Sequence, residues 1–404
     1  MLTRRTLLHL SSLSGLTAGL AVMAPRIVCR YNMALLAQIA PQRNLLGTTI
    51  VVPKDFLGMH FHRYPEGKPL SPAPSYSYGA VRSHDYAGKD DQGVRWSSLH
   101  VAPHTFRWGP LDTWIASHSR YNRTIIYTLY GTPRWLAKHS EIADDYGSLG
   151  GCAPPKDLAA VSEFIVALLT RYNSKDKRIQ FIEIWNEPAF HQDLHSFWTG
   201  SAAELAAMGK AIYQTAKAVD PTIRILSPGF NRFGTGGLSE LTLPDENAIY
   251  EYLSAPDGAG NIAGRWCDAL AIHTYEARIV DASHGIEGLL ARIRRMLKLL
   301  GLNLPIYNTE IGYEQKGSDF AHSDLAGKAS LLRRQAAVQA ALGVRGMYFY
   351  SHDDDLVGDP SRHVEIAHAL DEINSRLAGK TLRQVTILGN GKVRVESTDG
   401  TFVW

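Results

Sequence analysis

The feature that most constrains the fold is a repeated alternation of short β-branched apolar runs with longer segments of helical period. Predicted strands cover 56–62, 80–85, 124–130, 179–184, 223–230, 268–275, 304–310 and 345–351, and predicted helices cover 155–172, 201–219, 246–254, 286–300, 325–342 and 362–377. Eight such strands over about 320 residues predict an α/β fold, a (β/α)8 barrel. A doubly wound sheet is the weaker alternative, because the sequence contains no GxGxxG.

The sequence outside the repeat divides the chain further. We expect the barrel domain to cover 45–378 and a small C-terminal β extension to cover 380–404. Asn390-Gly391 and Asp399-Gly400 in this extension are typical of hairpin turns. A short strand at 47–52 precedes the repeat, and we expect it to pair with the extension.

Residues 1–30 are typical of an export signal rather than of a folded domain. Paired arginines, Arg4 and Arg5, precede an apolar run of small residues that reaches Ala24. This pattern resembles a bacterial twin-arginine signal, which implies a periplasmic or secreted protein. An uncleaved N-terminal anchor is the alternative, and the membrane is expected to be a partner only through this segment.

Charge and cysteine content exclude several classes of protein. Without the four arginines of residues 1–30, the chain has 38 basic and 39 acidic residues, so a nucleic-acid partner is not expected. The three cysteines, Cys29, Cys152 and Cys267, form no CxxC pair, which argues against a zinc ribbon. Cys152 follows one strand and Cys267 precedes another, so we expect no disulfide between them.

Two glutamates mark the ends of predicted strands. The run RIQFIEIWNEPAF places Glu187 just before Pro188, which cannot continue the strand. Glu310 ends the seventh strand in Tyr307-Asn308-Thr309-Glu310. Because catalytic groups in (β/α)8 barrels lie at the carboxyl ends of strands, both carboxyls should face one pocket. Glycosidic bond cleavage needs such a pair, one protonated and one ionised.

These motifs resemble a known enzyme family. The strings IEIWNEP, YNTE and GTPRW (131–135) are similar to clan A retaining glycoside hydrolases, and most of all to glycoside hydrolase family 39. The resemblance covers about 55–378. It implies a glycosidase that acts on a polysaccharide or oligosaccharide, β-linked or uronate-containing, without a cofactor and without a metal.

The resemblance also implies roles for single residues. Glu187 matches the acid/base and Glu310 the nucleophile. Asn186 matches the amide that holds the sugar 2-hydroxyl, and Arg82 matches an arginine that keeps the nucleophile ionised. His273 and Tyr275 match a strand-six pair, of which Tyr275 should touch Glu310.

The surroundings of Glu187 and Glu310 should give their two carboxyl groups different pKa values. We expect Arg82 to lower the pKa of Glu310, and Trp185 to help raise that of Glu187. Retention of configuration then predicts carboxyls about 5–5.5 Å apart.

The sequence departs from the clan where the sugar ring should rest. Strand eight ends in Tyr350-Ser351-His352, where many clan members have a tryptophan. Trp135, Trp108, Tyr350 or Phe349 could supply the stacking face instead. Ala189 also stands where many family members have Asn or Asp.

Other polar residues leave alternatives open. His60 and His62 share one strand face and could bind a metal, contact a sugar hydroxyl or simply pack. Asp353-Asp354-Asp355 is either a solvated loop or helix N-cap, or a set of polar contacts to a substrate or a structural cation. Glu183, inside strand four, needs a partner, and an inner arginine is expected.

Two other functions are alternatives to the glycosidase. One is a metal-dependent hydrolase on the same barrel, and the other is a catalytically inactive carbohydrate-binding barrel.

Overall fold

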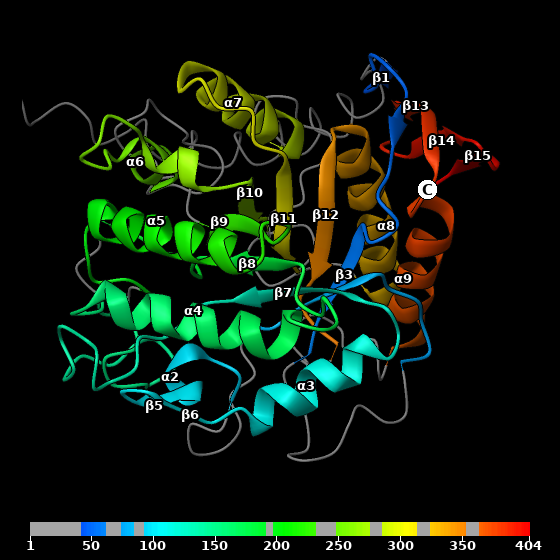
Figure 1. The fold of residues 1–404 in the computed structure, drawn as a ribbon. Coiled ribbons are helices and arrows are strands. Elements are labelled where there is room, and N and C mark those ends of the chain that lie inside the picture. Colours follow the sequence, from blue (N-terminus) through cyan, green and yellow to red (C-terminus); the bar gives the residue numbers. More distant parts are fainter. Residues whose placement is uncertain are drawn as a thin grey trace, which may run out of the picture.

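A computed structural model describes residues 42–61, 74–84, 93–190, 197–231, 248–274, 285–312, 324–352 and 363–404. Its centre is a closed, all-parallel barrel of eight strands (Figure 1), so the predicted fold class is confirmed. In barrel order from the first, the strands are β3 (Leu57–His60), β4 (Ala80–Arg82), β7 (Thr124–Thr128), β8 (Phe181–Glu183), β9 (Arg224–Phe230), β10 (Ala269–His273), β11 (Ile306–Ile311) and β12 (Val344–Phe349). The last strand closes against the first, with Met347 opposite Leu57.

Helices surround the barrel (Figure 1). The long ones are α3 (Gly109–Ser119), α4 (Leu158–Asn173), α5 (Ala202–Val219), α7 (Ile286–Leu299), α8 (Leu325–Ala341) and α9 (Val364–Leu377); the short ones are α2 (Trp96–Leu99), α6 (Ala248–Ser254) and the 3-10 turn η4 (Ala263–Trp266). Helix α5 begins at a capping box, in which Ser201 and Glu204 bond each other's backbone N–H. No helix in the described ranges is both long enough and apolar enough to cross a membrane.

The barrel interior changes from apolar to polar along its strands. A buried cluster separate from the main core contains Ala80, Ile126, Phe181, Leu226, Ala269, Ala271, Tyr307 and Tyr348. Side chains two residues apart share a strand face, so Arg82 lies above Ala80, Glu183 above Phe181 and His273 above Ala271. The apolar layer thus supports a charged layer at the carboxyl ends of the strands.

A small antiparallel sheet joins the two ends of the described chain. It contains β1 (Arg43–Asn44), β2 (Ile50–Val51), β13 (Thr381–Ile387), β14 (Val393–Ser397) and β15 (Gly400–Val403). The expected pairing of 47–52 with the C-terminal extension is confirmed, since β2 pairs with β13 through Val51 and Thr381. Strand β1, which the sequence did not predict, also pairs with β13.

The secondary structure between the second and third barrel strands was not predicted. It holds α2, α3 and a hairpin of β5 (His100–Ala102) and β6 (Thr105–Phe106). Cys152 and Cys267 are free and buried, as expected. Cys29 and the export segment lie outside the described residues, so export stays a prediction.

Candidate active site

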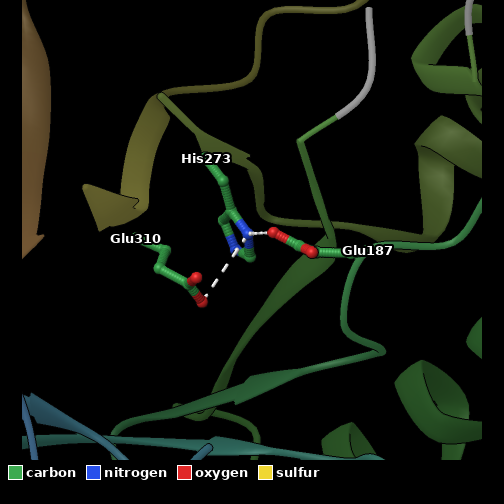
Figure 2. Close-up of side chains that lie close together, drawn as sticks. All are labelled: Glu187, His273 and Glu310. Atoms are coloured by element: carbon green, nitrogen blue, oxygen red, sulfur yellow. Dashed lines mark hydrogen bonds and ion pairs between the residues drawn. The ribbon is translucent and has the colours of Figure 1, made fainter. Parts of the chain in front are cut away.

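Four predicted site residues meet at the carboxyl ends of the strands. The Nδ1 of His273 lies 2.6 Å from a carboxylate oxygen of Glu187 and 3.7 Å from one of Glu310 (Figure 2). One ligand atom from each of these three residues lies within 4.8 Å of the others. From the other side, Nη1 of Arg82 donates to Glu310 at 2.9 Å. The two glutamates therefore converge on one place at the strand ends, as the sequence predicted.

Strand register explains why these side chains meet. In the parallel pair of β10 and β11, His273 lies opposite Glu310, and in β3 and β4, His60 lies opposite Arg82. Each of these residues is at the last inward position of its strand or next to it, so their side chains surround the same opening.

The backbone at Glu187 has an unusual conformation. Its φ is +44°, in the left-handed region that a residue with a side chain rarely adopts. The conformation is held, four residues beyond the end of β8, because the N–H of Glu187 donates to the Gly229 carbonyl at 2.8 Å. Strained backbone of this kind costs about 1–3 kcal/mol and clusters at functional sites.

Arg82 organises the floor of the site. Its side chain is completely buried, and it donates from Nε to Glu183 at 2.6 Å and from Nη2 to the Asn186 side-chain oxygen at 2.8 Å, besides its bond to Glu310. One planar guanidinium thus fixes two carboxylates and an amide. A cation this close favours the ionised form of Glu310.

Glu183 completes this floor, with the partner that the sequence predicted. It has no exposed surface, and besides Arg82 it accepts hydrogen bonds from the hydroxyls of Thr128 at 2.8 Å and Thr309 at 2.7 Å. Both of its oxygens are therefore bonded. This saturation makes Glu183 a positioning group for Arg82 rather than a group open to substrate.

Gly229 is a site residue that sequence reasoning missed. A Cβ at this position would lie 2.4 Å from Nε2 of His273 and 3.0 Å from Glu183. Glycine is thus required for these two side chains to occupy their places. The signal was a glycine inside the apolar run of β9, which marks a close approach of another group.

His60 and Tyr350 lie beside the site. The His60 ring is buried, with Nε2 2.9 Å from the Thr309 carbonyl oxygen, and its centre is 5.2 Å from the centre of the Tyr350 ring. Tyr350 is half-buried and directly follows the last residue of β12. The predicted residues His62 and Tyr275, and the acidic run 353–355, lie outside the described residues.

Two tryptophans have contacts that the sequence did not predict. Trp185 packs against Tyr130 and Trp198, and Glu187 contacts His273, which was not predicted. Trp135 donates from its indole to the His100 carbonyl at 2.9 Å and lines a separate pocket.

Comparisons with known proteins agree with this architecture. No family model matches the chain, and no curated protein does. Among solved structures, a glucosidase from Croceicoccus marinus has a TM-score of 0.58 at 14% identity, covering 88% of this chain and 77% of its own.

Two further structures bear on the fold. A family 39 β-xylosidase from Caulobacter crescentus has a TM-score of 0.58 at 16% identity over 87% of this chain and 79% of its own. Xylanase 10B from Thermotoga petrophila, solved with xylobiose, has a TM-score of 0.52 at 13% identity over 80% and 94%. The chain therefore has the fold of these glycoside hydrolases, in agreement with the fold that the resemblance in the sequence implies.

Proposed function

We propose that this protein is a retaining glycoside hydrolase that cleaves a polysaccharide or oligosaccharide. The observation that carries the proposal is the pair of carboxylates, Glu187 and Glu310, in which one oxygen of each lies within 4.8 Å of one oxygen of the other. Retaining enzymes have carboxyls about 5–5.5 Å apart, whereas inverting enzymes leave about 6.5–9.5 Å for a water molecule. The short separation supports double displacement, and the glycosidase fold supports the same reaction.

In this mechanism the two glutamates have different tasks. Glu310, held and kept charged by Arg82, attacks the anomeric carbon, while Glu187 protonates the departing oxygen. Glu187 then takes a proton from the water that releases the sugar from Glu310. When its proton is on Nδ1, His273 donates to the ionised Glu187 that this second step requires.

Asn186 is positioned for substrate. Its side-chain oxygen accepts from Arg82 at 2.8 Å, which leaves the NH2 group as the donor for a sugar hydroxyl. A contact of this kind to the 2-hydroxyl strengthens in the transition state.

Rescue kinetics test the proposal. Glu310→Ala should lose turnover of 4-nitrophenyl glycosides and regain it with azide, giving a glycosyl azide of inverted configuration. Glu187→Ala should keep turnover only on substrates with good leaving groups. Glu365→Ala, an exposed position on α9, is the matched control. A wild-type protein that binds sugars but turns over none would instead be an inactive carbohydrate-binding barrel.

One observation favours a second candidate, a metal-dependent hydrolase. Glu187, His273 and Glu310 are also, in the described part of the chain, a group of three that could hold a metal ion. The donor set suits a divalent cation, since it offers two carboxylates and an imidazole. Activity that disappears with a chelator, returns with Zn²⁺ or Mn²⁺ and shows no azide rescue would favour this candidate.

A further inference from the structure

A pocket lies on the same end of the barrel as the glutamates. It has a volume of about 590 Å³, and we call it the basic pocket; it is lined by Ser97, Ser98, Val101, Arg107, Pro133, Arg134, Trp135, Ser140 and Lys156. Its walls are the segment after β4 and the loop after β7, which the N–H of Trp96 ties together through a 3.0 Å bond to the Tyr130 carbonyl. Both segments follow the carboxyl ends of their strands.

The lining of the basic pocket has one sign of charge. Arg107, Arg134 and Lys156 are cations, and no aspartate or glutamate is among the lining residues. The nearby carboxylate of Glu163 is paired with His104 at 2.8 Å. Burial lowers the pKa of His100, behind Trp135, to about 4, so the charge of the pocket at neutral pH comes from arginine and lysine.

An indole is fixed among these cations. The bond from Trp135 to the His100 carbonyl and the edge-to-face packing of the two rings, 4.9 Å apart, hold Trp135 in one orientation. A fixed aromatic ring offers an apolar face for the C–H groups of a sugar ring. Serine hydroxyls beside it can exchange hydrogen bonds with sugar hydroxyls.

We propose that the basic pocket binds carboxylate-bearing sugar units, and hence that the substrate is an acidic polysaccharide that extends from the glutamates to this pocket. The inference rests on the proposed function. Arginine and lysine pair with carboxylates, the indole supports the ring, and the volume suits a small ligand.

The position of the pocket agrees with a polymeric substrate. Thr128 bonds Glu183 in the floor of the active site, and Pro133 lines the pocket five residues further along. Five residues span at most about 18 Å of chain. One oligosaccharide of several units can therefore reach both places.

The opposite end of the barrel supplies a matched control. A pocket of about 600 Å³ there is also basic, with Arg120, Arg123, Lys177 and Arg178, but its lining includes Asp176 and no aromatic residue. Arg178→Glu changes the net charge as Arg134→Glu does, at a distant position.

Binding measured by calorimetry tests the proposal. The probes are hexagalacturonate and hexaguluronate, each with its carboxyl-reduced neutral counterpart. We expect the wild-type protein to bind at least one acidic probe at least tenfold more tightly than its counterpart. Arg134→Glu should remove this preference, Trp135→Ala should weaken the binding of both members of the pair, and Arg178→Glu should change neither the preference nor the binding.

The proposal would be overturned if the wild-type protein bound acidic and neutral probes with equal affinity. It would also be overturned if Arg178→Glu lost as much of the preference for acidic probes as Arg134→Glu. A third contrary result is that inorganic sulfate displaces the acidic probe completely and that Trp135→Ala does not change probe binding. Because binding needs no turnover, a failed azide rescue would leave this result standing. Equal binding of the probes would likewise leave the hydrolase proposal intact.

Discussion

Replacing the buried Arg82 alone should lower the stability of the protein more than replacing Arg82 together with its partner Glu183. In Arg82→Met, Glu183 keeps only the hydroxyls of Thr128 and Thr309, in a place without solvent. Breaking a buried ion pair from one side costs about 3–5 kcal/mol, because the remaining charge is uncompensated. That is a large part of the roughly 5–15 kcal/mol that stabilises a folded protein.

The double variant Arg82→Met with Glu183→Gln should recover stability. Neutralising Glu183 removes the buried charge, so the second substitution should return roughly half of the loss; Glu310 still lacks its cation. Arg82→Met alone is therefore expected to be less stable than the double variant, so the effects of the two substitutions on stability are not additive.

Thermal unfolding measures this difference. An unfolding entropy of about 2.1 cal/mol/K per residue over 404 residues makes 3–5 kcal/mol equal to about 4–6 °C in Tm. Calorimetry of the wild type, both single variants and the double variant completes the cycle. Losses that simply add, or an Arg82→Met protein as stable as the wild type, would refute the assigned role of Arg82.

Three further predictions concern the site, a buried imidazole and a helix start. Gly229→Ala should displace His273, which a Cβ would approach to 2.4 Å, and should lower kcat/KM by about 10²-fold with an altered pH–rate profile. Burial lowers the pKa of His118 to about 3, so the unfolded chain alone takes up a proton below about pH 6.5. Wild-type stability in urea should hence fall about 2 kcal/mol more than that of His118→Leu between pH 7 and pH 5. Ser201→Ala removes a cap that bonds Glu204 and should cost about 1 kcal/mol in the same assay.

The sequence predicted the barrel because each strand is a short apolar run bounded by a turn residue or a proline. The convergence of Arg82, Glu187 and Glu310 followed from this, since a closed parallel barrel brings all strand ends to one opening. The partner of Glu183 was predictable as well, because a buried carboxylate inside a barrel needs an inner cation.

Contacts that depend on backbone detail were not predictable. The bond between His273 and Glu187 depends on the left-handed φ of Glu187 and on the missing side chain at Gly229, and neither follows from apolar periodicity. Helix α3 was not predicted because it begins with Gly109-Pro110 and because its apolar residues are not concentrated on one face of the helix. Trp135 was one of four residues that the sequence offered as a stacking face, and its place depends on the fold of the loop after β7.

The pairing of β2 with β13 has a consequence for how the protein is made. A ribosome delivers β2 early, but its partner emerges only after every barrel strand has been synthesised. Contacts between such distant segments form slowly, and unpaired strand edges invite wrong partners in the meantime. The small sheet is thus expected to assemble last in a newly made chain, so a ribosome-stalled intermediate that lacks β13 should expose β2 to protease while the finished protein protects it.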